Sequence, residues 1–448
     1  MSKQNQTKLN TSKIMALFEY FESPSGHQNP EKTDLMVGFF VSAIWQQAPQ
    51  TQHHTAYRTF SLRHSRAPGK LASSPPSRTS LSWLLLPNAR GLDMKFLPFT
   101  LAVTLFCMTG TSVSASTPIH TTSVRHNTGK CLDAAHHAAK DMNCEVSAVV
   151  RVGDRLIFAN DKPIKGKGTS SVFSIGLQAP EGLTRLPLNF EHLQYARSSL
   201  IDAAQKLEGL TTITLDDTHY VIASSAFTRA QNPAFNKILY WPVDKPAEAK
   251  QLGEAEVMRK QISTIVGEPF FQVEGTAIGP DGSLLLGIRQ QGRDYTTAYP
   301  VFTIVQAPIS LQAGELVIAG DFRLAYQFTP RVQGDEKPLS LSSLEYDPYN
   351  DRLLATTSYE DGDRIGGYLW TLPMSLLEPD AAGTAHPVLG QDGKPLWFDN
   401  KPEGVVALNA SQILVVHDDD RVQVADSAHG KAKKPNEFAY SVIELGNL

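Results

Sequence analysis

The stretch that decides the fold is "VEGTAIGPDGSLLLGIR", which runs from Val273 to Arg289. It joins a Glu-Gly dipeptide and a short apolar segment to a Pro-Asp-Gly turn and a second apolar segment. The stretches "LEGLTTITLDDTHYVIAS" from Leu207 and "PEGVVALNASQILVVHD" from Pro402 have the same pattern. Short runs rich in β-branched residues on both sides of such a turn predict two antiparallel strands. The chain therefore contains the same predicted hairpin three times.

Two weaker copies of the hairpin complete a regular series. "CEVSAVVRVGDRLIFAND" begins at Cys144, and "LSSLEYDPYNDRLLATTSYED" begins at Leu341. Anchored at the glutamate, or at Ser342 where the fourth copy lacks one, the five copies start at 145, 208, 274, 342 and 403. Spacing this regular indicates a repeat architecture.

Further strands follow each hairpin. A third strand is predicted in "SSVFSIGL", "NKILYWPV", "PVFTIVQA", "GYLWTLPM" and "AYSVIEL", and a fourth in "GELVIAGDF". Four-stranded antiparallel units repeated in this way predict an all-β fold, a five-bladed β-propeller, with six blades as the alternative. Because the last copy ends after its third strand, we expect "PIHTTSVRH" near residue 118 to supply the outer strand and close the ring. Short helices are expected in "SLIDAAQKLEG" and "EAEVMRKQISTIVG".

The N-terminal part of the chain has a different character. Residues 1–93 show no sustained periodicity and carry ten basic and five acidic residues. "MKFLPFTLAVTLFCMTGTSVSA" then has the layout of a signal peptide, with Val113-Ser114-Ala115 as its cleavage site. We expect residues 1–93 to be a spurious or disordered extension, 94–115 a signal peptide, 116–143 a closing segment and 144–448 the propeller. A disordered leader with an internal membrane anchor is the alternative.

Composition limits the function of the expected mature protein. Residues 116–448 carry 30 basic and 40 acidic residues, a net charge of −10, which argues against nucleic-acid binding. No later apolar run is long enough to span a membrane, and Cys107 follows the bulky Phe106, unlike a lipidation site. An exported protein is expected, periplasmic or secreted. Cys131 and Cys144 most simply form a disulfide; a metal site with the adjacent His136 and His137 is the weaker alternative.

The propeller geometry predicts where the repeated glutamates lie. The start of each inner strand and the end of the next strand share one face, so Glu145, Glu208, Glu274 and Glu403 should form a partial ring around one mouth of the channel. Glu274 and Arg289 should meet there. The loops that open onto this face, called here the Glu/Arg mouth, carry further charged residues: Asp161, Lys162, Arg229, Arg293, Asp361, Asp363, Arg364, Asp418, Asp419, Asp420 and Arg421.

Converging carboxylates repel one another unless a positive charge neutralises them. A Ca²⁺ ion held by Glu145, Glu208, Glu274, Glu403 and Asp418 would do so, since this cation prefers oxygen ligands. Alternatively, the nearby arginines pair with the glutamates or clamp a phosphate or carboxylate. A third interpretation is structural: each glutamate accepts backbone N–H bonds from a neighbouring blade.

Established catalytic motifs give no further guidance. The sequence contains no Gly-x-Ser-x-Gly elbow, no His-Glu-x-x-His motif, no phosphate-binding loop and no dinucleotide fingerprint. Among the histidines only His417 is notable, because it ends a predicted strand beside Asp418. An isolated histidine in a strand is more often a packing residue than a ligand.

The Glu-Gly strands, together with Leu286-Gly287-Ile288-Arg289, give the chain a family resemblance. Over roughly residues 142–448 it resembles secreted bacterial propellers of the phytase-like and esterase-like-phytase group, and related bacterial propellers of unknown function. The resemblance implies calcium ions at the channel that bind acidic residues and substrate phosphates. Glu208, Glu274 and Glu403 match the repeated Glu-Gly pattern fully, whereas Val146 follows Glu145 and Ser342 replaces the fourth glutamate.

Two functional expectations follow. The first is a ligand or metal site at the Glu/Arg mouth that supports Ca²⁺-assisted hydrolysis of a small phosphorylated ligand. Glu274, Arg289 and Arg293 would be its catalytic residues. The second is a propeller without catalytic activity that binds a partner protein or a cell-envelope component.

Overall fold

The computed structural model describes residues 118–138, 142–177, 188–362, 364–381, 383–419, 425–426 and 431–446. These residues all belong to one compact unit. The expected N-terminal extension and signal peptide, residues 1–115, lie outside the described residues, as do Asp363, Asp420 and Arg421.

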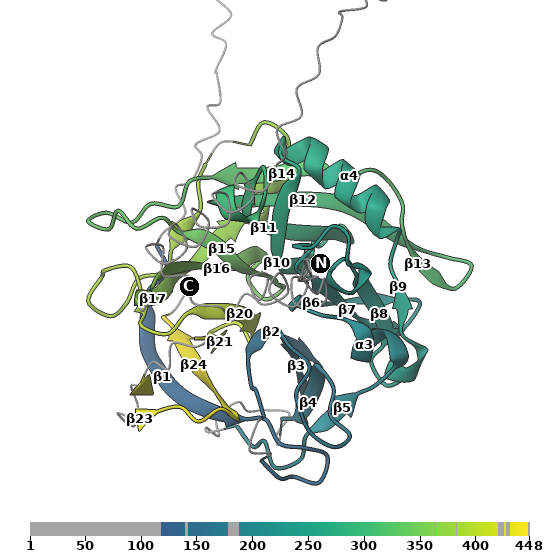
Figure 1. The fold of residues 1–448 in the computed structure, drawn as a ribbon. Coiled ribbons are helices and arrows are strands. Elements are labelled where there is room, and N and C mark those ends of the chain that lie inside the picture. Colours follow the sequence, from purple (N-terminus) through teal and green to yellow (C-terminus); the bar gives the residue numbers. More distant parts are fainter. Residues whose placement is uncertain are drawn as a thin grey trace, which may run out of the picture. The chain divides into compact units, whose positions relative to one another are not determined.

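Five antiparallel sheets surround a central channel, so the fold is the expected all-β propeller with five blades (Figure 1). Blade 1 contains β2 (Val146–Val152), β3 (Arg155–Asn160), β4 (Val172–Gly176) and β5 (Gln194–Ala196). Blade 2 contains β6 (Leu207–Leu215), β7 (Thr218–Ser225), β8 (Ile238–Pro242) and β9 (Lys250–Gln251).

The third and fourth blades each have one additional strand. Blade 3 contains β10 (Phe270–Ile278), β11 (Ser283–Gly292), β12 (Tyr299–Gln312), β13 (Glu315–Ile318) and β14 (Arg323–Phe328). Blade 4 contains β15 (Ser340–Asp347), β16 (Arg352–Asp361), β17 (Arg364–Pro373), β18 (His386–Pro387) and β19 (Trp397–Phe398). In both blades the extra strand pairs with the third strand, β12 or β17.

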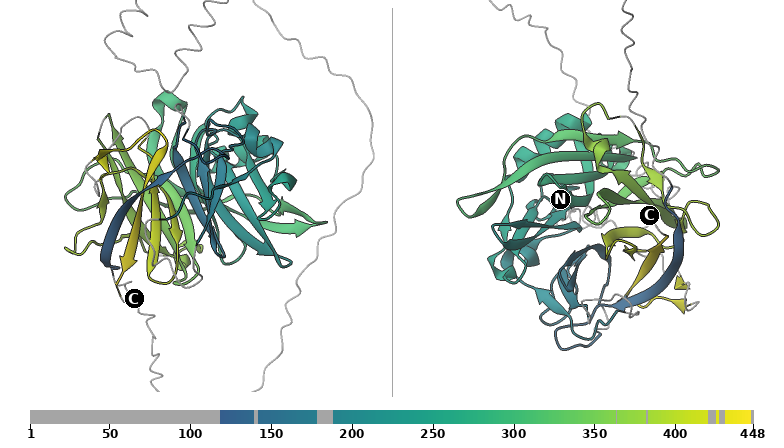
Figure 2. Two further views of the ribbon diagram at one scale, coloured as in Figure 1. Left: turned by 90° about the horizontal axis from the view of Figure 1, so that it is seen from below. Right: turned by 180° about the vertical axis from the view of Figure 1, so that it is seen from behind.

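Blade 5 is built from both ends of the described chain. It contains β20 (Pro402–Ala407), β21 (Gln412–His417), β24 (Glu437–Leu445) and, outermost, β1 (Thr121–Lys130). Figure 1 shows β1, in blue, along the outer edge of the yellow C-terminal strands, and the reverse view in Figure 2 shows the same pairing. The expected closure of the ring by the segment near residue 118 is therefore confirmed.

Helices are few and short. The two expected ones are confirmed as α3 (Ser199–Ala203) and α4 (Ala255–Val266), each of which precedes an inner strand. Single 3₁₀ turns are η1 (Pro233–Phe235), η2 (Pro246–Glu248), η3 (Tyr295–Thr297) and η4 (Met374–Leu377), and β22 (Ala425–Asp426) pairs with β23 (Lys431–Ala432).

The hydrophobic core lies between neighbouring blades. Phe158 of blade 1 stacks on Phe173 with ring centroids 5.2 Å apart, and Phe438 of blade 5 packs against Phe158 at 5.7 Å. The predicted disulfide between Cys131 and Cys144 is buried in the same cluster. It joins the segment after β1 to the segment before β2, and so links the closing strand to blade 1.

Every inner strand has an irregularity at the same point of its hairpin. The pairing register shifts at Ser147, Glu208, Glu274, Ser342 and Glu403, each of which is bypassed by the neighbouring strand. Such a bulge re-aims the side chain of the extra residue. In blade 1 the bulge is at Ser147, so the repeat equivalent of the other glutamates is this serine. The alignment of the first copy at Glu145 is wrong by two residues.

The glycine after the bulge has a packing role. A Cβ atom at Gly404 would lie 3.0 Å from the Cα atom of Ala148, and one at Gly275 would lie 3.0 Å from the backbone nitrogen of Leu344. Contacts this short with backbone atoms of the next inner strand leave no room for a side chain. The Glu-Gly dipeptide is thus explained: the bulge directs the glutamate, and the glycine lets adjacent blades approach.

Candidate functional site

The bulges bring three glutamates together at one mouth of the channel. Glu208, Glu274 and Glu403, called here the central triad, place carboxylate oxygens within 4.8 Å of one another. All three are only 2–3 % exposed. They come from β6, β10 and β20, so three different blades supply the group.

Arg289 occupies the centre of the ion pairs. Its Nη1 lies 3.4 Å from Glu274 Oε2 and 3.7 Å from Glu403 Oε1, while its Nη2 lies 2.6 Å from Glu360 Oε1. The expectation that Glu274 and Arg289 meet is confirmed. The reason is the register, because Glu274 lies near the start of β10 and Arg289 near the end of β11, which pair antiparallel.

Two lysines that the sequence reasoning missed complete the neutralisation. Lys206 Nζ lies 3.0 Å from Glu208 Oε1, and Lys401 Nζ lies 2.8 Å from Glu403 Oε1 and 2.9 Å from Glu360 Oε1. Each lysine precedes its glutamate by two residues, in "KLEG" and "KPEG". This shared Lys-x-Glu-Gly pattern in the sequence could have identified both lysines as partners of the glutamates. In the third copy Gln272 holds the equivalent position and donates a hydrogen bond to Glu274.

Burial makes the central triad weakly acidic. It raises the pKa of Glu208 and of Glu274 to about 7 and that of Glu403 to about 8, although Lys206, Arg289 and Lys401 act in the opposite direction. Burial would also raise the pKa of Glu360, but Arg289 and Lys401 outweigh it and hold that pKa well below the usual range. The mouth therefore contains carboxyl groups that exchange protons near neutral pH.

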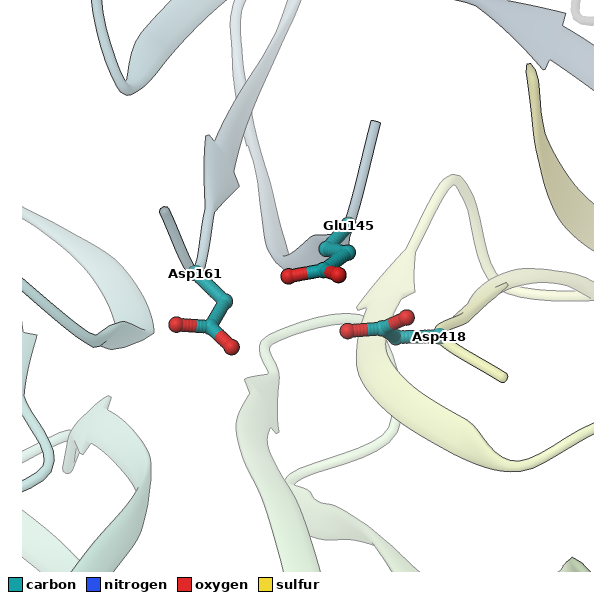
Figure 3. Close-up of side chains that lie close together, drawn as sticks. All are labelled: Glu145, Asp161 and Asp418. Carbon is teal, nitrogen blue, oxygen red and sulfur yellow. The ribbon is translucent and has the colours of Figure 1, made fainter. Parts of the chain in front are cut away.

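A second group of carboxylates lies beside the first. Glu145, Asp161 and Asp418, called here the rim triad, face a common space, and their ligand oxygens lie within 4.8 Å of one another (Figure 3). Lys206 connects the two triads, because its Nζ is 2.8 Å from Asp161 Oδ2 as well as 3.0 Å from Glu208. Lys162 lies 2.5 Å from Glu145 Oε2 and is 51 % exposed.

The rim triad has room for an additional positive charge. Asp161 is 2 % exposed, yet its Oδ1 atom has no hydrogen-bond partner among the described residues. A buried carboxylate oxygen without a partner is costly, and a cation with oxygen ligands would satisfy it. Sequence reasoning placed Asp161 on this face but did not count it among the metal ligands.

The two blades without a glutamate at the bulge use serine instead. Ser147 Oγ donates to the carbonyl of Leu207 over 2.6 Å, and Ser342 Oγ donates to the carbonyl of Pro402 over 2.7 Å. In each case the accepting carbonyl belongs to the residue directly before a central-triad glutamate in the next blade. These serines therefore link the inner strands and fix the backbone that carries Glu208 and Glu403.

Several predicted site residues lie elsewhere. Arg293 is 78 % exposed, and its Nε lies 3.2 Å from Oδ2 of the adjacent Asp294. Arg229 stacks over Phe235 at 4.6 Å, and Asp361 and Arg364 pair with each other in an exposed turn.

Two residues near Asp418 have structural partners. Asp419 is buried and accepts hydrogen bonds from Asn400 Nδ2 (2.7 Å) and from the backbone N–H of Lys401 (3.0 Å). His417 is buried with its Nε2 2.8 Å from Ser441 Oγ, and burial lowers its pKa to about 3. His417 is therefore a neutral packing residue.

No protein-family model matches the chain, and no curated protein matches it. Among solved structures, it is similar to an α-L-arabinofuranosidase from Podospora anserina in complex with cellotriose (9 % identity, TM-score 0.38, covering 74 % of this chain and 97 % of that one). It is also similar to the catalytic domain of a Coprinopsis cinerea GH62 α-L-arabinofuranosidase, with 10 % identity and a TM-score of 0.38, covering 72 % of this chain and 97 % of that one. For the β-xylosidase RS223 the identity is 11 % and the TM-score 0.38, and the match covers 69 % of this chain and 96 % of that one.

Likeness at these identities and TM-scores says nothing about the chemistry of this chain. None of the helices in the described residues combines the length and hydropathy that membrane crossing requires.

Proposed function

We propose that the Glu/Arg mouth binds Ca²⁺ through the rim triad, Glu145, Asp161 and Asp418, and that the cation completes a site for a phosphate ester. The observation that carries the proposal is the buried Oδ1 atom of Asp161, which has no hydrogen-bond partner in the described part of the chain while two further carboxylates face it. Three carboxylates offer three to six of the six to eight oxygen ligands that Ca²⁺ takes.

The balance of charge at the mouth favours a cation. Among the described residues of the two triads and their ion-pair partners, seven carboxyl groups face four basic side chains: Glu145, Asp161, Glu208, Glu274, Glu360, Glu403 and Asp418 against Lys162, Lys206, Arg289 and Lys401. The central triad is already neutralised by Arg289, Lys206 and Lys401, so Glu208, Glu274 and Glu403, three of the five ligands expected from the sequence, are less suited to a metal. In the rim triad, Lys162 pairs with Glu145 and Lys206 with Asp161, and the exposed side chain of Lys162 can move aside.

We further propose that the site hydrolyses the phosphate ester. A bound Ca²⁺ would hold phosphate oxygens and lower the pKa of a coordinated water. Water attacks phosphorus, the bond from phosphorus to the ester oxygen breaks, and Glu274, with a pKa of about 7, donates a proton to the leaving oxygen. Arg289 offsets the negative charge that develops. Arg293, exposed and paired with Asp294, has no part in this scheme.

Two readouts test the two parts separately. Addition of Ca²⁺ should raise the melting temperature of the wild-type protein, and the Asp161→Asn variant should lose most of that shift. Phosphate release from p-nitrophenyl phosphate should require Ca²⁺ and should fall at least tenfold in Glu274→Gln. A calcium shift without phosphate release would refute hydrolysis alone, whereas no calcium shift in the wild type would refute the metal site.

The ion pairs of the central triad favour a second candidate function, a propeller that binds a ligand without catalysing a reaction. Glu208, Glu274 and Glu403 each have a basic partner, which suits a structural ring. The ligand would then be a partner protein or a cell-envelope component that carries phosphate groups. Calcium-dependent retention of unhydrolysed p-nitrophenyl phosphate would support this candidate over the enzyme.

A further inference from the structure

The opposite end of the channel contains a cavity that the proposed function does not use. Its volume is about 600 Å³, within the range typical of small-molecule sites. All five blades contribute to it near the C-terminal ends of their inner strands, so it lies at the far mouth of the channel. Its wall includes Arg151, Thr211–Leu215, Ile278–Gly282, Glu345–Tyr346, Pro348–Tyr349 and Ala407.

The cavity is poorly suited to an ion. The one basic side chain in its wall, Arg151, donates from Nε to the carbonyl of Gly153 over 2.9 Å and from Nη1 to that of Leu408. Asp281 accepts hydrogen bonds from the backbone N–H and the hydroxyl of Ser283. Among the described residues, no group of three metal-ligating side chains lies here. Neither a free guanidinium for an anion nor a carboxylate cluster for a cation is present.

Glu345 is an acidic residue of this wall whose side chain has no partner among the described residues. Its side chain is partly buried in the cavity wall and makes no hydrogen bond or ion pair with any other described residue. Burial, together with the like charge of Asp347, raises its pKa well above the usual range. Asp347 itself is fixed by Arg352, whose Nε lies 2.9 Å from its Oδ2. The raised pKa favours the protonated carboxyl of Glu345, which can both donate and accept hydrogen bonds.

Aromatic rings border the same cavity. Tyr349 is 49 % exposed, and its position is fixed by the turn between β15 and β16, where its backbone N–H donates to Asp347 Oδ1 over 3.0 Å. Asn350 ties this turn to blade 5 through the carbonyl of Ala410, 3.0 Å away. Tyr346 also lines the cavity, and its hydroxyl donates to Asp351 over 3.0 Å. An exposed ring on a fixed turn offers an apolar face to a ligand.

We propose that the far-mouth cavity binds a small neutral polyhydroxylated molecule, a sugar or a cyclitol, whose hydroxyls pair with Glu345 and whose apolar face packs on Tyr349. Such a ligand both donates and accepts hydrogen bonds, carries no charge, and has a flat C–H face. The hydroxyls suit the carboxyl of Glu345, and the lack of charge suits a wall without an unpaired ion site among the described residues. The C–H face suits the exposed ring of Tyr349.

The test is saturation-transfer NMR on the purified protein with D-glucose, D-xylose and myo-inositol as probes. At least one probe should receive saturation from the wild type. The signal should fall at least fivefold in Tyr349→Ala and in Glu345→Leu, and should persist in Glu345→Gln, which keeps a neutral donor and acceptor. Tyr295→Ala is the matched control, because Tyr295 is 64 % exposed but lies outside the cavity wall.

Three results would overturn the proposal. One is the absence of transfer to all three probes. Another is transfer that both Tyr349→Ala and Glu345→Leu leave unchanged, since the ligand would then bind elsewhere. The third is loss of transfer in Glu345→Gln, which would mean that an ionised carboxylate is required. Circular dichroism of each variant shows that it is folded, and Tyr349, on the surface, can be replaced even if Glu345→Leu does not fold.

Discussion

The two mouths of the channel are made by the same five inner strands, yet they differ in chemistry. At the Glu/Arg mouth, buried carboxylates and basic side chains fill the space with ion pairs from Lys206, Arg289 and Lys401. At the far mouth, a cavity of about 600 Å³ remains, and its wall is mostly uncharged. A residue's place along an inner strand therefore decides which kind of site it serves.

The bulge explains the difference. It recurs near the start of every inner strand and directs Glu208, Glu274 and Glu403 to a common point. Toward the ends of these strands the register is regular, and a cavity remains there. Three of the five bulges carry a buried glutamate, and serines occupy the other two.

The largest expected effect comes from removing the central cation of the Glu/Arg mouth. Arg289→Met leaves Glu274, Glu360 and Glu403 without a shared partner, and breaking a buried ion pair in this way costs about 3–5 kcal/mol. Urea unfolding should show this loss. Arg293→Met, at an exposed site, should change the free energy of unfolding by less than about 0.5 kcal/mol. Equal effects of the two changes would mean that the Arg289 network contributes nothing.

The next effect is on the pH dependence of stability. The pKa of Glu403 is about 8 in the folded protein, above its unfolded value, so its contribution is fully present below about pH 4.5 and is lost as pH rises through about 8. Glu403→Gln cannot ionise. The free energy of unfolding of the variant relative to the wild type should therefore rise by roughly 4 kcal/mol between pH 5 and pH 9.

Chemical denaturation at several pH values would measure this. A difference between the variant and the wild type that stays constant across the range would contradict the raised pKa of Glu403.

A smaller effect is expected on calcium binding, which should depend on the Glu/Arg mouth and not on the far mouth. Asp161→Asn removes a charged ligand of the rim triad and should weaken calcium binding at least tenfold in a calorimetric titration. Asp281→Asn is the matched control, because Asp281 lines the far cavity and belongs to neither triad. If Asp281→Asn weakened binding more than Asp161→Asn, the cation site would be at the wrong mouth.

The smallest effect is expected from Glu345→Gln. The carboxyl of Glu345 has no hydrogen-bond partner among the described residues, and burial raises its pKa, which favours the protonated form. An amide of the same size should therefore change the free energy of unfolding by less than about 0.5 kcal/mol. Urea unfolding at pH 7 checks this. A large gain in stability would show that Glu345 is charged in the wild type.

The repeat made the fold and part of the site predictable. Five copies of one hairpin predicted five blades, and the missing outer strand of the last copy predicted closure by the segment that contains β1. Antiparallel pairing alone placed Glu274 next to Arg289. Two cysteines in a chain expected to be exported predicted the Cys131–Cys144 disulfide.

Other features depended on details that a repeat pattern does not carry. A bulge shifts register without changing the residue types around it, so the first copy was aligned at Glu145 although the bulge is at Ser147. Arg293 follows Arg289 by four residues, but η3 and Asp294 hold it at the surface. The far cavity is lined by residues from all five blades, which no single stretch of sequence displays.

The most direct test of the proposed calcium site at the rim triad is the anomalous difference map of a crystal grown with Ca²⁺ and measured at a long X-ray wavelength. We predict one strong peak between Glu145, Asp161 and Asp418, with Lys162 displaced from Glu145. No peak at the rim triad, or a peak only among Glu208, Glu274 and Glu403 or in the far cavity, would contradict it.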